Sequence, residues 1–437
     1  MILQSAQAAL RRWTKRAVLP GLERTRRLLE LCGHPERCCP AVQITGTNGK
    51  GSVAALVSSM AQAAGYRVGC FTSPHLADER ERITLDGKPA KAAAFAAAVK
   101  RLLPALQRMK RQGQPATTFE AWTVLAAELF RSQGAQLAVL EVGMGGRLDA
   151  TSAWQDIRLS LLTNVQLEHT DFLGTTRQAI LREKAGLARP GVPMLCAEPD
   201  PALRRQLQAL GQGRGFPVKF TGARPGDAVR ILRRQRVPGG LAVDLKVASR
   251  TNLQLRIPLA GAFQADNLAL AVAAAGELET AGFPGLRRAI PAGCRRVKWP
   301  GRLETIHRRP WVILDGAHNP AAAQALAQEF REQDASCLLI AGCMADKDTT
   351  GIAAALAPIA QQAWTVTPPD ARGLPAPELA RIFRQQGVPA RPCRTLAAAV
   401  RAAFSAAGLK SIILITGSLY LLEPARRIVR RLNDKGF

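Results

Sequence analysis

A glycine-rich stretch, Gly46-Thr47-Asn48-Gly49-Lys50-Gly51-Ser52, separates the apolar segment 41–44 from residues 53–64, where apolar side chains recur with helical spacing. A turn of this kind between a strand and a helix exposes backbone N–H groups that can hold phosphate groups. Its spacing is shorter than in the common G-x-x-x-x-G-K-[ST] pattern, and an additional glycine precedes the serine. We predict a nucleotide-binding loop in which Lys50 meets phosphate charge and Ser52 supplies the first magnesium ligand.

Strand-like and helix-like segments alternate on both sides of this loop. Such alternation predicts an α/β fold with a mainly parallel sheet. Residues 218–257 contain more strand-like alternation and more basic side chains than the segment directly before them. We expect strands at 67–71, 136–142, 159–164 and 192–197, and helices at 90–109, 119–131 and 265–280.

A second α/β pattern follows residues 291–301, which carry Pro, Gly and a charge cluster typical of an interdomain linker. We therefore expect two domains, 1–297 with a P-loop-type sheet and 298–437 with a smaller, Rossmann-like α/β fold. Within the second domain we expect strands at 311–314, 337–341, 363–366 and 411–416, and a helix at 321–333.

The composition is that of a soluble cytoplasmic protein. Of the 437 residues 47% are apolar, and no apolar run approaches the roughly 20 residues that span a bilayer. Nine cysteines stand at irregular positions without a C-x-x-C pair, which favours reduced thiols over a zinc site or disulfides. The Arg-rich first 26 residues are interpreted as a plain helix rather than as a transit peptide.

The formal net charge of +27 raises the alternative of a nucleic-acid binder. The basic residues are scattered, in short clusters such as 233–236 and 295–298, and form no single arm. Aromatic residues make up only 5%, so platforms for base stacking are not visible. We interpret the charge as a solvated basic surface, which would also steer polyanions such as ATP into clefts.

Two further polar positions follow strands. Glu141 ends the apolar run 136–142, where an acidic residue faces the ligand crevice of an open α/β sheet. His169 follows the strand expected at 159–164 and could join carboxylates around a metal. Each has an ordinary alternative, because strand-end glutamates often cap or face solvent and loop histidines are often incidental.

These segments, in this order, resemble the folylpolyglutamate synthase family, the folate branch of the Mur ligase superfamily. The resemblance extends over nearly the whole chain. It is carried by the phosphate loop, the Glu141 segment, residues 169–171, and the motifs at 21–24, 72–76, 81–83, 117–120, 182–186, 264–267, 300–302, 315–320, 345–348 and 416–418.

The resemblance implies an ATP-dependent ligase that adds L-glutamate to dihydropteroate, to a tetrahydrofolate, or to both, through an acyl phosphate. Domain 1–297 would bind ATP and folate, and domain 298–437 would be the glutamate ligase domain. The implied partners are small molecules, with no nucleic acid and no membrane, and the implied state is a monomer. The choice of acceptor stays open, with activity on both favoured.

The resemblance also implies roles for individual residues. Ser52, Glu141 and His169 would ligate magnesium, with two ions expected, and Lys184 would be N-carboxylated. Lys50, Lys184 and His169 would act in catalysis. The nucleotide would be held by Gly46, Thr47, Asn48, Gly49, Lys50, Gly51, Ser52, Val53, Asn267, Arg302 and Asp315. The substrate side would include Glu23, Arg24, Ser73, His75, Leu148, Asp149, Ala150 and His318.

The chain departs from the family pattern at a few positions. Gln166 and Glu168 stand where the family usually has Gly and Asp before the metal-site histidine. Because a longer carboxylate moves its charge by about a methylene, these changes affect the partners of His169. Acceptor recognition is affected at Glu79, Arg80 and Ser152, where the family usually has an aromatic residue, Asn and Asn.

Two rival functions follow from the same residues. A cell-wall Mur ligase would share the phosphate loop and the carboxylated lysine, but segments 72–75 and 141–149 are features of the folate branch. A nucleic-acid-dependent P-loop ATPase would account for the charge, and it predicts stimulation by RNA or DNA with steep salt dependence.

Overall fold

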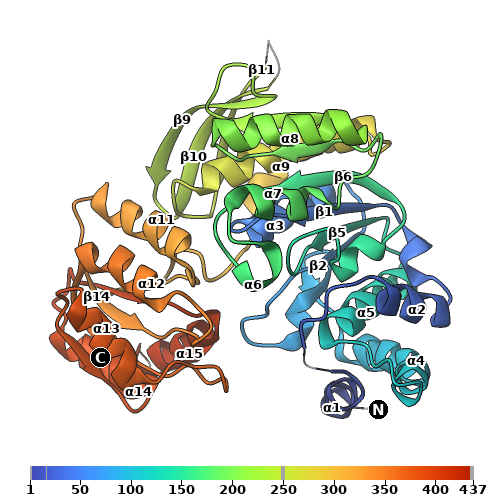
Figure 1. Cartoon of the computed structure of the whole chain (residues 1–437). Coiled ribbons are helices and arrows are strands. Elements are labelled where there is room, and N and C mark those ends of the chain that lie inside the picture. Colours follow the sequence, from blue (N-terminus) through green and yellow to red (C-terminus); the bar gives the residue numbers. More distant parts are fainter. Residues whose placement is uncertain (1, 16, 248–250, 434–437) are drawn as a thin grey trace. The chain divides into compact units, whose positions relative to one another are not determined.

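The protein forms two compact units in a computed structural model that describes residues 2–15, 17–247 and 251–433 (Figure 1). Unit 1 comprises residues 1–235, 242–258 and 264–298, and unit 2 comprises residues 236–241, 259–263 and 299–437. The expected α/β class with a large, mainly parallel sheet and a second, smaller one is confirmed. The functional boundary expected at 297/298 stays a prediction.

Most of unit 1 is built on an eleven-stranded sheet with the order β11-β10-β9-β8-β7-β6-β1-β5-β2-β3-β4. The central strand β1 runs parallel to both β5 and β6, and all five of its residues are buried. The strands are β1 (Ala41–Thr45), β2 (Val68–Phe71), β3 (Ile83–Leu85), β4 (Lys88–Pro89), β5 (Leu137–Glu141), β6 (Ile157–Leu162), β7 (Met194–Cys196), β8 (Val218–Gly222), β9 (Val229–Val237), β10 (Gly240–Val247) and β11 (Thr251–Ile257).

The helices of unit 1 follow the apolar periodicity of their segments. Helix α5 begins with a capping box in which the Thr117 hydroxyl accepts from the Glu120 N–H and the Glu120 carboxylate accepts from the Thr117 N–H. The helices are α1 (Leu3–Trp13), α2 (Glu23–Leu31), α3 (Lys50–Ala63), α4 (Ala92–Arg111), α5 (Thr118–Gln133), α6 (Thr170–Leu173), α7 (Arg177–Ala185), α8 (Pro201–Arg214), α9 (Gln264–Thr280) and α10 (Leu286–Arg296).

The expected linker at 291–301 is partly wrong, because residues 291–296 belong to helix α10. Pro291 lies inside that helix, and Gly293 packs so closely on α3 that a Cβ there would lie 2.5 Å from Met60 Cα. Burial of Ile290 and Cys294 against the rest of unit 1 outweighs the local Pro and Gly signal. The strand expected at 159–164 is also displaced, since β6 begins at Ile157 and ends at Leu162.

Unit 2 contains a six-stranded sheet with the order β12-β13-β17-β14-β15-β16. Only the β12–β13 pair is antiparallel. The strands are β12 (Glu304–Arg308), β13 (Trp311–Leu314), β14 (Cys337–Ala341), β15 (Ala360–Thr365), β16 (Ala390–Pro392) and β17 (Ile412–Thr416). The helices are α11 (Pro320–Arg331), α12 (Thr349–Leu356), α13 (Ala376–Gln385), α14 (Leu396–Ala406) and α15 (Leu422–Asn433).

Among the described residues, no helix combines the length and the apolar character needed to cross a bilayer. The longest helix, α4, carries basic side chains along its course and a proline at position 104. All nine cysteines are free thiols, as the irregular spacing predicts.

Candidate active site

The phosphate loop lies at the carboxyl end of β1, between the ends of two neighbouring strands. Ile44 of β1 is paired with Glu141 of β5, and Thr45 is paired with Leu162 of β6. The residues that follow β1, β5 and β6 therefore meet at one edge of the sheet, where ligands of open α/β sheets bind. This register brings the predicted loop, Glu141 and the segment that leads to His169 to the same edge.

Two loop positions require glycine. Gly46 has a φ of +135°, and a Cβ there would lie 1.8 Å from the Thr163 hydroxyl oxygen. Gly49 has a φ of +88°, and a Cβ there would lie 2.3 Å from Asn267 Oδ1. A side chain at either position would be strained in the backbone and would collide with a neighbour. The loop is thus shaped by the segment after β6 and by helix α9.

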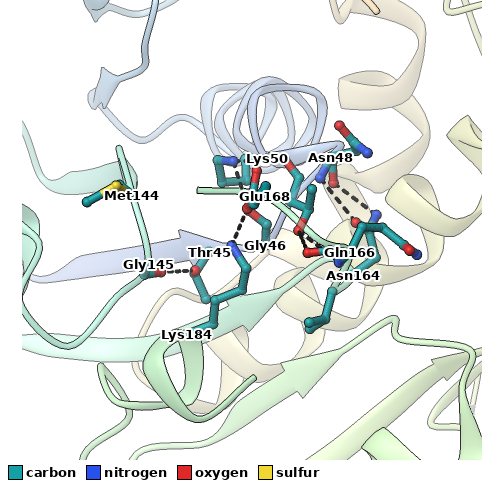
Figure 2. A network of polar contacts seen from close by, with 12 residues as sticks. Thr45, Gly46, Asn48, Lys50, Met144, Gly145, Asn164, Gln166, Glu168 and Lys184 are labelled. Atoms are coloured by element: carbon teal, nitrogen blue, oxygen red, sulfur yellow. Dashed lines mark hydrogen bonds and ion pairs between the residues drawn. The ribbon is translucent and has the colours of Figure 1, made fainter. Parts of the chain in front are cut away.

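Polar contacts hold the loop to the segment after β6 (Figure 2). The Asn48 N–H donates to Asn164 Oδ1, and Asn164 Nδ2 donates to the Asn48 carbonyl, both at 3.1 Å. The Gln166 N–H donates to the Thr47 hydroxyl at 3.0 Å. Because Gln166 makes this last contact through its backbone, its departure from the family pattern leaves that contact possible.

Lys50 lies at the N-terminus of α3 with its ammonium folded back over the loop. Its Nζ donates to the Gly46 carbonyl at 2.8 Å and to the Thr47 carbonyl at 3.0 Å. These two bonds orient the ammonium at the position where phosphate oxygens would compete for it. The arrangement fits the role in phosphate binding that the sequence predicts.

Helix α9 brings Asn267 to the loop. Asn267 Nδ2 donates to Gln264 Oε1 at 2.8 Å, and Gln264 Nε2 lies 3.4 Å from the Ser52 hydroxyl. Ser52 is buried, with 2% of its surface exposed. The predicted nucleotide residues of unit 1 are therefore together, whereas the individual contact of Asn267 with a nucleotide stays a prediction.

The proposed magnesium ligands come from the ends of the same strands. Glu141 ends β5, is 5% exposed, and its Oε2 accepts from the Ser73 N–H at 3.0 Å. His169 precedes α6 in a left-handed backbone conformation with φ of +47°. Such a conformation is costly for a residue with a side chain and is found at functional sites more often than elsewhere.

The donor set suits a magnesium ion that is completed by substrate. Within residues 2–15, 17–247 and 251–433, no three His, Cys, Asp or Glu side chains gather as a metal-binding group. Magnesium is commonly held by one or two carboxylates, with water and phosphate oxygens filling its other positions. The Ser52 hydroxyl and the Glu141 carboxylate fit that pattern, and the imidazole of His169 would add a nitrogen ligand.

Lys184 forms a buried ion pair that the sequence does not predict. Its Nζ lies 2.6 Å from Glu168 Oε1, and the two side chains are 1% and 15% exposed (Figure 2). Burial, reinforced by the charge of Lys50 and opposed by Glu168, lowers the pKa of Lys184 to about 8. Burial alone would raise the pKa of Glu168, but the charges of Lys184 and Lys50 hold it at about 2.

A pocket of about 340 Å³ opens beside this site in unit 1. Its wall includes Ser73 and His169, together with the predicted Leu148, Asp149 and Ala150. Apolar side chains that the sequence did not single out complete it, and they include Leu19, Pro20, Phe119, Met144 and Phe172. A concave, mainly apolar pocket of this volume suits an aromatic small molecule.

Three predicted residues of unit 2 lie together at the carboxyl end of β13. The buried Asp315 accepts from the Leu303 N–H at 2.9 Å and from the Ala317 N–H at 2.8 Å. Burial raises the pKa of Asp315, and the positive charge of Arg302 opposes that shift. His318 donates from Nδ1 to the Gly316 carbonyl at 2.8 Å. The roles of Arg302, Asp315 and His318 toward substrates stay predictions.

Sequence comparison matches both units to known families. Residues 44–275 match the Mur ligase middle domain, and residues 301–419 match the domain described as "Mur ligase, glutamate ligase domain". The dihydrofolate synthase/folylpolyglutamate synthase of Mycobacterium tuberculosis is 35% identical over 82% of this chain and 76% of its own length. The chain belongs to the folylpolyglutamate synthase and dihydrofolate synthase family of Mur ligases.

A longer relative carries the same region as part of a larger protein. The probable bifunctional folylpolyglutamate synthase/dihydropteroate synthase of Haloferax volcanii is 38% identical over 94% of this chain. The chain spans 48% of that protein, about half its length. The chain therefore matches most of one relative and about half of a longer one.

Solved structures of this family have the same fold. Folylpolyglutamate synthase of Mycobacterium tuberculosis complexed with ADP aligns with a TM-score of 0.88 at 31% identity, covering 98% of both chains. A bifunctional folylpolyglutamate synthase/dihydrofolate synthase with Mn, AMPPNP and L-glutamate bound aligns with a TM-score of 0.83 at 27% identity. That alignment covers 99% of this chain and 98% of the other.

Within this family fold, Asp149 shapes the pocket wall through backbone contacts. Its Oδ2 accepts from the Gly143 N–H at 3.0 Å and the Met144 N–H at 3.1 Å. Its Oδ1 accepts from the Thr151 N–H at 2.9 Å and the Thr151 hydroxyl at 2.6 Å. These four bonds occupy the carboxylate, so its observed contribution is to hold the loop. A direct contact with the acceptor stays a prediction.

Of the substrate-side residues expected in unit 1, three do not line the pocket, namely Glu23, Arg24 and His75, and His318 of unit 2 is not among the described lining residues either. Arg24 instead supports a wall residue, since its Nε lies 3.0 Å from Glu120 Oε1. His75 accepts at Nδ1 from Arg82 Nε at 2.9 Å. The contact between Arg24 and Glu120 joins two motifs that the sequence singles out, at 21–24 and 117–120. Because these residues are 96 positions apart, the sequence gives no sign that they pair.

The remaining departures from the family pattern have polar partners. Arg80 pairs with Asp78 at 2.7 Å, and Glu79 pairs with Arg11 at 2.8 Å. The Ser152 hydroxyl donates to the Gly146 carbonyl at 2.6 Å. These three residues contact the segments around the site, and none of them lines the pocket.

Proposed function

We propose that this protein is an ATP-dependent ligase that joins L-glutamate to dihydropteroate, to a tetrahydrofolate, or to both. One observation carries the proposal: the pocket and the strand-end site share a wall. Ser73 and His169 line the pocket, and the Ser73 N–H donates to Glu141 at 3.0 Å. An acceptor seated in the pocket can therefore present its carboxylate to a nucleotide held by the neighbouring loop.

The reaction has two displacement steps. The acceptor carboxylate attacks the γ-phosphorus of ATP, ADP leaves, and an acyl phosphate forms. The amine of glutamate then attacks the acyl carbon, phosphate leaves, and the nitrogen loses a proton. Such chemistry depends mainly on positioning and on neutralising charge, which the loop N–H groups and Lys50 supply. The chain's own residues form no covalent intermediate.

Magnesium would be held by Ser52, Glu141 and His169, and two ions are expected from the family resemblance. When bound, the metal would neutralise charge on the transferred phosphate. The manganese and nucleotide in a related solved structure support a divalent ion for this chain. Asn267 in unit 1 and Arg302 and Asp315 in unit 2 would contact the nucleotide.

We further infer that Lys184 is N-carboxylated in the active enzyme. The neutral amine adds CO₂ and releases a proton, which converts a cation into a carbamate anion. With a pKa lowered to about 8, a usable share of the amine, about one tenth, is neutral at pH 7. The carbamate would have to part from Glu168, because the two groups would then carry like charges.

Lys50 provides the test of the ligase proposal. Lys50→Ala should abolish ATP-dependent incorporation of glutamate, assayed separately with dihydropteroate and with tetrahydrofolate. The matched control is Lys100→Ala, at an exposed position on α4. Near-normal turnover by Lys50→Ala would contradict the site, and no turnover by the wild type with either acceptor would contradict the folate assignment.

The carbamate can be tested directly. Protein equilibrated with ¹³C-bicarbonate should give a carbamate carbon resonance that is lost in Lys184→Arg. An identical spectrum for both proteins would contradict the modification. We also propose that the protein is cytoplasmic, which the nine free thiols support. We propose that it is a monomer, which gel filtration would test.

A further inference from the structure

A basic hollow of about 430 Å³ lies in unit 1, away from the residues assigned to the active site. It is formed by helix α10 and by strands β9, β10 and β11. These three strands lie at one end of the eleven-stranded sheet (Figure 1). Arg233 of β9, Arg256 of β11 and Arg295 of α10 line it, and all three side chains are exposed. Three elements thus direct guanidinium groups toward one hollow.

The three arginines that line the hollow lack a carboxylate partner among the described residues. Within the described part of the chain, none of them forms an ion pair with a carboxylate at 4.0 Å or less. Lys219, on β8 of the same sheet, pairs with Glu277 at 2.6 Å. Convergence of unpaired like charges is unfavourable, and a bound anion would relieve it.

The other lining groups restrict the kind of anion. The described lining contains no aromatic side chain, so it offers no platform for a nucleobase. Gln235 and Gln254 contribute carboxamides, and Asp244 contributes a carboxylate. Asp244 would repel a polyphosphate, whereas it could accept a hydrogen bond from a ligand N–H group. A chain that carries carboxylates and also amide N–H groups matches this mixed lining.

We propose that the hollow binds an oligo-γ-glutamyl chain, the tail of a polyglutamylated folate. This inference rests on the proposed function for the source of the chain, but not for the chemistry of the site. The arginines would bind side carboxylates, and Asp244 would accept an amide N–H. The net charge of +27 would attract the same polyanion from solution.

Binding of free hexa-γ-glutamate, which carries no pterin, tests the site without any need for turnover. Arg233→Gln/Arg295→Gln should weaken its binding about 5- to 10-fold, as expected for two exposed guanidinium contacts. The control Arg108→Gln/Arg205→Gln removes the same charge from exposed positions on α4 and α8. It should leave binding within about 2-fold of the wild type. Equal weakening by both double variants, or no binding by the wild type, would overturn the proposal.

Two further readouts separate a tail site from a general anion site. Tripolyphosphate, which has charge but no N–H donor, should compete poorly for hexa-γ-glutamate, and competition at equal concentration would overturn the proposal. In turnover, the Arg233→Gln/Arg295→Gln enzyme should show a raised KM for a hexaglutamylated acceptor only. Its KM for the monoglutamate and its kcat should be unchanged. If the wild type lacks ligase activity but binds the free chain, the proposed function fails while the site stands.

Discussion

The Lys184 ammonium and the Glu168 carboxylate lie 2.6 Å apart in the interior of unit 1. Glu168 stands where the family usually has the shorter aspartate, and its partner Lys184 lies on α7. Glu168 directly precedes His169 in the chain, so the ion pair adjoins a proposed metal ligand. The ammonium of Lys184 therefore has its counter-charge within hydrogen-bonding distance.

Removing that counter-charge should destabilise unit 1. In CO₂-free buffer, Glu168→Gln leaves a buried ammonium unpaired and should lower the free energy of unfolding by about 3–5 kcal/mol. Denaturant unfolding measures this loss. The control is Glu183→Gln on α7, beside Lys184, and its partner Arg147 lies 3.0 Å away with 54% of its side chain exposed. That exposed pair should be worth at most about 1 kcal/mol. Equal losses in the two variants would contradict the buried pair.

Gly49 should be indispensable for nucleotide binding because of Asn267. Gly49→Ala puts a methyl 2.3 Å from Asn267 Oδ1 and also strains a backbone with φ of +88°. We expect ADP binding, measured by calorimetry, to fall by at least about 100-fold, which corresponds to about 3 kcal/mol. Gly65→Ala is the matched control, with φ of +95° and no atom within 4 Å of the added Cβ. It shares the strain, and it should bind ADP normally.

The local part of this site is predictable from the sequence because it depends on short-range chemistry. The phosphate loop lies between a strand and a helix as expected, but α3 begins at Lys50 rather than at Val53, so residues 50–52 form the first turn of the helix. Parallel pairing of β1 with β5 and β6 brings Glu141 and the His169 segment to the same sheet edge. Strand β13 has the bounds expected from its apolar run. The family resemblance, confirmed by comparison, extends these local motifs to the whole chain.

Long-range packing accounts for what the sequence does not predict. Lys184 resembles a surface lysine in its own helix, and its burial depends on the loop that carries Glu168. The pocket wall takes Pro20 and Phe119 from segments far apart in the chain. Pro291 suggests a linker, yet α10 continues through it because its apolar side is buried. None of these outcomes is encoded in a window of a few residues.

Arg24 should affect acceptor binding through Glu120. Glu120 is 4% exposed, lines the pocket and accepts from Arg24 Nε at 3.0 Å. Arg24→Ala leaves this carboxylate without its cation and should destabilise the protein by about 3 kcal/mol. Steady-state kinetics should show a raised acceptor KM with the KM for ATP unchanged. Arg26→Ala, at an exposed position on α2, is the control, and an acceptor KM equal to that control would contradict the argument.

His75 should make the stability of unit 1 depend on pH in the acidic range. Burial and the positive charge of Arg82 lower the pKa of His75 from 6.5 to about 4. The negative charges of Glu81 and Asp78 oppose this shift. Because Arg82 donates to Nδ1, the folded protein favours the neutral ring with its proton on Nε2. Between pH 6.5 and 4 the unfolded chain binds more protons than the folded one, so the contribution of His75 to stability falls as the pH falls.

The measurement is the difference in unfolding free energy between the wild type and His75→Gln across that range. The difference should be constant above pH 6.5 and should shift steadily against the wild type from pH 6.5 down to 4. Carboxyl groups with raised pKa values, such as Asp149 and Asp315, titrate in both proteins and cancel. A difference that is independent of pH, or that shifts in favour of the wild type on acidification, would show that the ring is not held neutral by Arg82.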